Sequence, residues 1–188
     1  MRTVKKPEER KAEMVEAAAK LFTVQGFVKT SVAEIVAAVD VAKGLFYYYF
    51  TTKDDMVKAV AEGWAAHCAD VMGRIAGAPL TGTEKLRSIV DCPIWARLHD
   101  TPFFADLCLP QHAALYADAV ARVADHIAPA LCRVAEQAAR EGEAQVVYPE
   151  ASVRVLVSGL ATLAQRGELT RDIAASVTGH MLGLKAPL

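Results

Sequence analysis

The segment over residues 30–56 constrains the fold of this 188-residue chain more than any other. It reads TSVAEIVAAVDVAKGLFYYYFTTKDDM. Ser31 followed by Glu34 is the pattern of a capping box, in which a hydroxyl and a carboxylate close the first turn of a helix. We therefore expect a short helix, a turn over 39–41, a second short helix over about 42–49 and then a longer helix. Two short helices joined by a tight turn predict a compact helical head.

The remainder of the chain has the pattern of a helical protein. Apolar residues recur at helical spacing between few breakers, and the short apolar run 145–148 is the only stretch that could form a strand. The hydrophobic fraction of 53% is enough for a sizeable core. We predict an all-α fold, with an N-terminal three-helix helix-turn-helix head over residues 1–52 and a larger helical domain over 53–188 that share the helix beginning at about 53. Pro129 should kink or split the long helix expected over about 110–140.

Charge is unevenly distributed along the chain. The net charge is -1, but residues 1–58 carry an excess of +2 and the rest an excess of -3. The basic residues that crowd near the N-terminus are Arg2, Lys5, Lys6, Arg10 and Lys11. This asymmetry suits an N-terminal part that meets phosphates and a C-terminal part that does not.

The chain should be cytoplasmic and not associated with a membrane. Its first ten residues are charged, unlike a signal peptide, and it has no apolar run of about 18 residues that could form a membrane span. Four cysteines, Cys68, Cys92, Cys108 and Cys132, have no CxxC pairing. In a reducing compartment we expect them to be free thiols.

The second short helix has the residues that a helix needs to enter the major groove of DNA. Leu45, Phe46 and Phe50 are candidates to dock it against Ile35 and Val41. Lys43, Gly44, Tyr47 and Tyr48 are candidates for its outward face. A glycine lets the backbone approach a base edge, and a tyrosine offers its ring to a thymine methyl group and its hydroxyl to a base or phosphate. Thr30, Ser31 and Lys53 stand at helix starts, where backbone N–H groups favour anions. The aromatic run could instead be a core cluster of any helical protein, and Tyr49 fits either role.

Several spacings in residues 10–58 match together and resemble the DNA-binding region of TetR-family transcriptional regulators. The matching residues are Ala17, Ala18, Leu21, Phe22, Gly26, Phe27, Thr30, Ser31, Glu34, Ile35, Ala38, Val41, Lys43, Gly44, Phe46 to Phe50, Lys53 and Met56. The resemblance implies base or groove contacts from Lys43, Gly44, Tyr47 and Tyr48, and phosphate contacts from Thr30, Tyr49 and Lys53. The sequence departs from the family pattern at Asp40, where a glycine is usual, and at Ala42, where a hydroxyl N-cap is usual.

The resemblance also implies a homodimer that binds a palindromic double-stranded DNA operator. It implies a repressor that an unknown small-molecule effector releases from that operator. A regulator that acts as an activator, or that has no effector, is the alternative. Candidates for the dimer interface form apolar stripes on the last two helices: Val153, Val157, Leu160, Ala161, Ile173, Val177, His180 and Met181. The same stripes could be ordinary intrachain core.

An effector pocket would need large, mostly apolar side chains with a few polar tips. The candidates are Trp64, Cys68, Met72, Trp95, Phe103, Phe104, Cys108, His112 and Tyr116, each of which could instead fill the core. Cys108 and His112 provide at most half of a metal site, so we predict no metal and no cofactor. Paired carboxylates at fixed spacing, a phosphate loop and a Ser/His/Asp arrangement are all missing, so we do not expect an enzyme.

Overall fold

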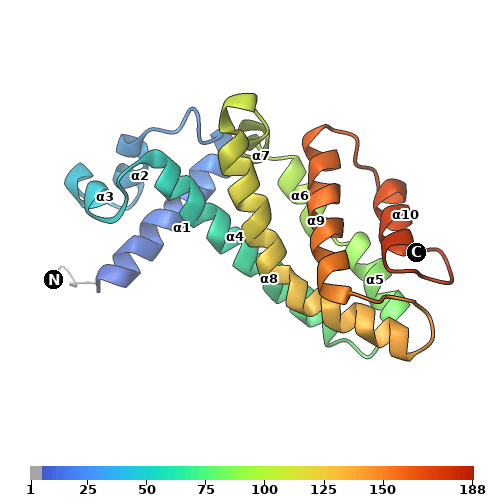
Figure 1. The fold of residues 1–188 in the computed structure, drawn as a ribbon. Coiled ribbons are helices and arrows are strands. Elements are labelled where there is room, and N and C mark those ends of the chain that lie inside the picture. The colour runs from blue at the N-terminus through green and yellow to red at the C-terminus, as the bar shows by residue number, and fades with distance from the viewer. Residues whose placement is uncertain (1–5) are drawn as a thin grey trace. The chain divides into compact units, whose positions relative to one another are not determined.

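The computed structural model describes residues 6–188, and the regular elements among them are all helical (Figure 1). In chain order they are α1 (Pro7–Gln25), α2 (Val32–Ala38), α3 (Lys43–Tyr49), α4 (Lys53–Ala76), α5 (Gly82–Val90), α6 (Pro93–His99), α7 (Pro102–Leu107), the 3-10 turn η1 (Pro110–His112), α8 (Ala113–Arg140), α9 (Pro149–Gln165) and α10 (Arg171–Met181). The predicted all-α class is confirmed. Within residues 6–188, β-type pairing is limited to one isolated bridge between Ala144 and Leu184. Arg2 and Lys5 lie outside the described residues.

Local caps explain where several helices begin. Ser31 and Glu34 form the predicted capping box of α2, and Thr81 forms a second one at α5 with Glu84. Thr52 stands before α4 and accepts a hydrogen bond from the N–H of Asp55, three residues later. Each cap satisfies backbone groups that a helix end leaves without an intrahelical partner. These contacts are local, so the sequence alone could predict them.

The chain packs as two compact units. The first contains residues 6–63 and 97–118 of the described chain, and the second contains residues 64–96 and 119–188. Three helices, α4, α6 and α8, continue from one unit into the other along the chain. This division follows packing, so the functional boundary expected near residue 52 stays a prediction.

The first unit is built around α1, which packs on both α2 and α7. Met14, Ala18 and Phe22 line the buried side of α1, while Ile35 of α2 and Phe46 of α3 are also fully buried. Helix α3 packs on α2. Figure 1 shows these two short helices (blue to cyan) next to α1. Burying each large apolar side chain contributes about 1.5–3 kcal/mol relative to leaving it exposed, which stabilises the otherwise marginal seven-residue helices.

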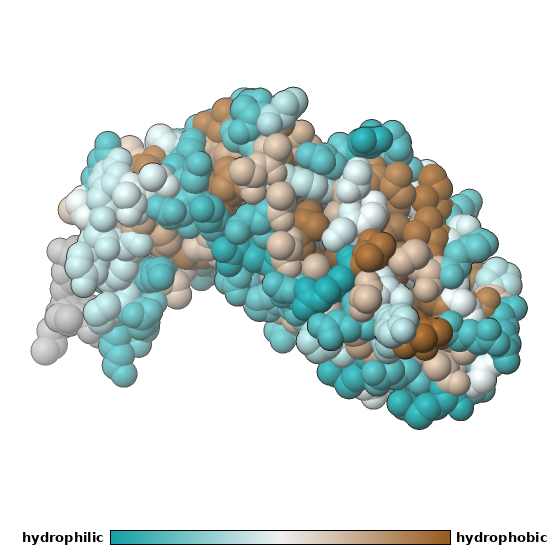
Figure 2. All heavy atoms as spheres, viewed as in Figure 1, coloured by the Kyte–Doolittle hydropathy of each residue, from teal (hydrophilic) through white to brown (hydrophobic). Residues whose placement is uncertain are grey.

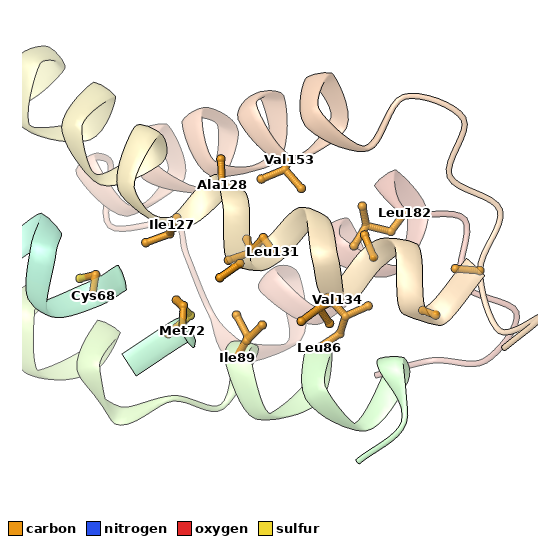
Figure 3. Packing of buried hydrophobic residues seen from close by; sticks show 14 of the residues in the cluster. Cys68, Met72, Leu86, Ile89, Ile127, Ala128, Leu131, Val134, Val153 and Leu182 are labelled. Carbon is orange, nitrogen blue, oxygen red and sulfur yellow. The ribbon is translucent and has the colours of Figure 1, made fainter. Parts of the chain in front are cut away.

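The second unit has its own hydrophobic core (Figure 3). Its labelled members come from α4 (Cys68, Met72), α5 (Leu86, Ile89), α8 (Ile127, Ala128, Leu131, Val134), α9 (Val153) and the segment after α10 (Leu182). Helix α8 passes through Pro129 without being split, contrary to one of the two effects predicted for this residue. Pro129 is exposed while its neighbours Ala128 and Ala130 are buried. The carbonyl that loses its donor can therefore be solvated, and packing on the buried side keeps the helix continuous.

None of the helices in the described part of the chain combines the length and the apolar character needed to cross a membrane.

Candidate nucleic-acid interface

The start of α2 is held by a network of hydrogen bonds around Glu34. The Ser31 Oγ accepts from the N–H of Glu34 at 3.2 Å, and the Ser31 N–H donates to Glu34 Oε2 at 2.7 Å. Gln25, the last residue of α1, donates from Nε2 to Glu34 Oε1 at 3.2 Å. Hydrogen bonds from the Ser31 backbone, the Ser31 side chain and the Gln25 side chain lower the pKa of Glu34. The α1 end and the α2 start are therefore fixed to one another.

The turn between α2 and α3 takes the form that its sequence predicts. Asp40 has a φ of +50°, a left-handed conformation that glycine adopts freely and that aspartate tolerates better than most residues. The Val41 N–H donates to the Val36 carbonyl at 3.1 Å, which closes the turn. Ala42 is the N-cap of α3 and provides no side-chain hydrogen bond. Helix α3 therefore begins without the cap that α2 has.

One face of α3 docks the helix on the head. Phe46 and Phe50 are buried, with ring centroids 5.5 Å apart, and Ile35 of α2 is fully buried as well. Leu45 and Val41 are half-buried. Lys11 of α1 lies with its Nζ 5.7 Å from the centroid of the Phe50 ring, a cation–π distance. All five predicted docking residues are thus at least partly removed from solvent.

The opposite face of α3 is exposed at all four predicted groove residues: Lys43, Gly44, Tyr47 and Tyr48. Tyr47 is 53% exposed and Tyr48 is 75% exposed, although large aromatic side chains usually bury most of their surface. The Lys43 Nζ lies 6.0 Å from the centroid of the Tyr47 ring. A Cβ atom added at Gly44 would meet nothing within 4 Å, so packing within the chain does not require glycine here. Tyr49 is half-buried and contacts Tyr48 edge to face at 4.9 Å.

The loop over residues 26–30, which joins α1 to α2, uses its polar groups internally. Thr30 is buried, and its hydroxyl donates to the Gly26 carbonyl at 2.6 Å and accepts from Gln25 Nε2 at 3.2 Å. The Lys53 Nζ donates to the carbonyls of Phe27, Val28 and Thr30 at 2.8, 3.3 and 3.3 Å. The Thr30 hydroxyl and the Lys53 ammonium are therefore already bound by this loop, whereas Ser31 is exposed beside them.

Asp106 of α7 also binds this loop, and sequence reasoning did not select this residue. Its Oδ2 accepts a hydrogen bond from the Val28 N–H at 2.8 Å. The two residues are 78 positions apart, and no local pattern marks such a pair. Two of the predicted pocket residues pack against α1 and this loop. The Phe103 ring stacks on Phe22 of α1 at 5.7 Å between ring centroids, and the His112 ring lies 4.8 Å from the Phe27 ring of the loop. Both side chains belong to the packing of the first unit.

The other predicted pocket residues fall into the two units separately. Trp64, Cys68, Met72 and Trp95 belong to the second unit, where Cys68 and Met72 are fully buried and the two tryptophan rings lie 6.5 Å apart. Phe104, Cys108 and Tyr116 belong to the first unit, where the Phe104 and Tyr116 rings lie 6.1 Å apart. Desolvation by burial is the main cause that raises the pKa of Cys68 and of Tyr116, each to about 12, and it raises the pKa of Cys108 as well. These groups are uncharged at neutral pH.

All four cysteines are free thiols. Within residues 6–188, no group of three or more His, Cys, Asp or Glu side chains could hold a metal ion.

The predicted dimer residues differ in exposure. Val153 is fully buried in the core of the second unit, and Val157, Leu160, Ala161 and Val177 are partly buried. Ile173, His180 and Met181 are exposed. The exposed residues of α9 differ from the predicted ones and include Val155, Ser158, Gly159 and Thr162. Val155 is 61% exposed, and Figure 2 shows hydrophobic residues (brown) gathered over α9 and α10. The second unit thus presents an apolar surface on its last two helices.

Three comparisons relate this geometry to known proteins. Residues 14–60 match the family model described as "Bacterial regulatory proteins, tetR family". The HTH-type transcriptional regulator HbdR of Aromatoleum sp. (strain CIB) is 42% identical over 50 residues, which are 27% of this chain and 22% of that protein. An uncharacterized HTH-type transcriptional regulator of Bacillus subtilis (strain 168), YvdT, is 33% identical over 66 residues, which are 35% of this chain and 34% of that protein. The chain thus spans only about a third or less of the length of these relatives.

The fold is similar over a much larger part of the chain. A crystal structure of RolR in complex with resorcinol superposes with a TM-score of 0.74 at 17% identity, and the match covers 96% of this chain and 90% of RolR. At this identity the likeness speaks for the fold alone. The segment matched by the family model contains the α2–turn–α3 motif, and the helical fold of nearly the whole chain is similar to that of RolR. Over residues 14–60 the chain is thus similar to the TetR family of bacterial regulatory proteins.

Proposed function

We propose that this protein binds duplex DNA by laying α3 in the major groove and regulates transcription from that site. The observation that carries the proposal is the two-sided character of α3. Phe46 and Phe50 hold the helix from inside, while Lys43, Tyr47 and Tyr48 are exposed on its outer face. The fold does not use these three side chains for its core, and a helix of this kind fits the width of the major groove.

The proposed contacts follow from the chemistry of each side chain. Lys43 can donate to guanine O6 and N7 or to a phosphate, and the Tyr47 and Tyr48 rings can pack on thymine methyl groups. The open space around Gly44 lets the α3 backbone approach a base edge. Ser31 and Tyr49 are proposed as phosphate contacts. Thr30 and Lys53 support the interface in this proposal by fixing the loop over residues 26–30, since their polar groups are bonded there.

We further propose that the protein is a homodimeric repressor with a palindromic operator. The exposed apolar residues of α9 and α10 support pairing of two copies, and a two-fold dimer would present two α3 helices to half-sites about 34–36 Å apart. Genomic DNA as target agrees with the cytoplasmic location that the sequence predicts.

A small-molecule effector would release such a repressor by binding better to a conformation with wrongly spaced α3 helices. The aromatic rings of Phe104 and Tyr116, which lie 6.1 Å apart, favour an effector without net charge, and RolR, of similar fold, was crystallised with resorcinol. Helix α4 runs along the chain from the head into the second unit, and so it is the proposed lever.

A binding experiment with matched controls tests the DNA proposal. Duplexes are first selected from a random-sequence library with the wild-type protein, and gel-shift affinities are then measured. We expect Tyr47→Ala and Lys43→Ala each to weaken binding about ten-fold, the loss of about 1.4 kcal/mol that one good base contact provides. Tyr148→Ala and Lys185→Ala remove equally exposed residues of the second unit and should bind normally. Unchanged binding by both α3 variants would refute the assignment.

The dimer proposal has a separate test. Ile173→Glu places a charge on the exposed apolar surface of α10 and should shift sedimentation from dimer to monomer. Val24→Glu, on an exposed valine of α1, is the matched control and should leave the oligomeric state unchanged. A wild-type protein that sediments as a monomer at all concentrations would exclude the homodimer.

A further inference from the structure

Asp106 stands at a position that helix α7 itself does not favour. It lies near the C-terminal end of α7 (Pro102–Leu107), where the negative end of the helix dipole disfavours a carboxylate. Its side chain leaves the helix and accepts the Val28 N–H in the loop over residues 26–30 at 2.8 Å. A charged acceptor makes a stronger hydrogen bond than a neutral one. The reason for an aspartate here is thus found in the loop.

Gly26 shows that the loop is shaped to receive this carboxylate. A Cβ atom added at Gly26 would overlap Asp106 Oδ2, so glycine leaves the space that this carboxylate occupies. Gly26 also has a φ of +82°, which glycine adopts at little cost. Two independent features of one residue, its missing side chain and its backbone conformation, therefore fit the position of Asp106.

His112 holds the backbone of Asp106 from the other side. The His112 Nδ1 lies 2.7 Å from the Asp106 carbonyl oxygen, and since a carbonyl only accepts, Nδ1–H is the donor. The His112 ring also packs on Phe27, in the middle of the loop, at 4.8 Å between centroids. Phe103 contacts the same Phe27 ring at 6.0 Å. The loop is thus clamped by α7 and η1 through one charged hydrogen bond and two ring contacts.

The far end of this loop is the start of the DNA-reading motif. Thr30 is buried there, and Ser31 directly follows it as the N-cap of α2. Helix α2 in turn packs on α3. Any displacement of the loop therefore moves the N-cap of α2 and, with it, the platform on which α3 rests.

We infer that Asp106 is a positioning residue for DNA binding, which holds the loop over residues 26–30 and so sets how α2 and α3 meet the groove. The inference rests on the proposed DNA-binding function. Asp106 touches no DNA in this role and acts through Val28. Helix α8 follows η1 and continues along the chain into the second unit. Asp106 therefore gives that unit a second connection to the loop, besides the one through α4 and Lys53.

The test compares Asp106→Ala with Asp106→Asn. The alanine variant removes the acceptor, whereas the asparagine Oδ1 can still accept from the Val28 N–H. Asp70→Ala, which removes an exposed aspartate of α4, is the control for the change in charge. Each protein is measured for amide hydrogen exchange at Val28 without DNA and for affinity to the duplex selected by the wild type. If the alanine variant does not fold, Asp106→Ser, with a side chain too short for the bond, takes its place with the same expectation.

We expect the alanine variant to remain folded, to exchange the Val28 amide about ten-fold faster and to bind the duplex several-fold more weakly. The asparagine variant should recover most of both losses, and Asp70→Ala should lose neither. Faster exchange with unchanged DNA affinity would overturn the positioning role. Equal DNA losses in the alanine and asparagine variants would overturn it as well, because the hydrogen bond would not be the cause. A wild-type protein that selects no duplex would refute the proposed function itself, and the inference with it.

Discussion

The exposed face of α3 and the loop over residues 26–30 are both parts of the candidate interface, yet they differ in how their polar groups are used. On α3, Lys43, Tyr47 and Tyr48 are exposed to solvent. In the loop, the Thr30 hydroxyl donates to the Gly26 carbonyl, and three other carbonyls accept from Lys53. The difference separates residues that can reach a partner from residues that hold others in place. It predicts that changes on α3 affect binding directly, whereas changes around the loop affect stability and alter binding only by moving α2 and α3.

Lys53→Met is the variant with the largest expected effect on stability. It keeps the apolar stem and removes an ammonium that donates to three carbonyls. Because hydrogen bonds from a charged donor contribute about 1.5–3 kcal/mol, we expect a loss of that size in the free energy of unfolding. Urea denaturation measures it, with Lys58→Met on the exposed side of α4 as control. An unchanged midpoint would mean that Lys53 is free for a partner after all.

Ala42→Ser should strengthen α3 without touching its exposed face. The N-cap of α3 has no side-chain hydrogen bond, and a serine hydroxyl there can accept from a backbone N–H of the first turn. We expect the free energy of unfolding to rise by about 1 kcal/mol. Ala38→Ser, an exposed change at the end of α2, is the control and should not stabilise the protein. A stability unaffected by Ala42→Ser would show that α3 is already fully ordered by packing.

Gly44→Ala should make the free protein more stable but weaken its binding to DNA. The added methyl group meets nothing within 4 Å, and alanine is a better helix former than glycine by about 0.5–1 kcal/mol, so the free protein should become slightly more stable. If the α3 backbone lies against base edges, the same methyl group should weaken binding to the selected duplex. Thermal unfolding and gel-shift titration of one preparation measure both. Unimpaired binding would place Gly44 away from the DNA.

The smallest expected effect is a pH dependence at the junction of α1 and α2. Hydrogen bonds from Ser31 and Gln25 lower the pKa of Glu34 below its usual value of 4.5. A depressed carboxyl pKa stabilises the fold above 4.5, and this contribution is lost as the pH falls through the folded-state pKa. Glu34→Gln should therefore be less stable than the wild type at neutral pH, and the two should converge in acid. Glu168→Gln, an exposed change, should show no such convergence.

Local sequence patterns predict much of the helical fold and the division of α3 into two faces. The capping boxes at Ser31 and Thr81 and the left-handed Asp40 depend on residues at most a few positions apart. Helical spacing likewise separates the buried Phe46 from the exposed Tyr47 and Tyr48. Such interactions are local, so their pattern can be recognised in the chain before it folds.

Which polar and apolar side chains are already engaged within the protein depends on how its helices pack in three dimensions. Thr30 and Lys53 fit a phosphate contact by their position in the sequence, but their polar groups are bonded within the loop. Val153 shares a helical stripe with other apolar residues of α9 but belongs to the core of its own unit. Asp106 meets Val28 across 78 residues, and such a pairing is created by the packing of α7 on α1. Burial and long-range hydrogen bonds depend on which helix faces meet, and no spacing within one helix specifies its neighbour.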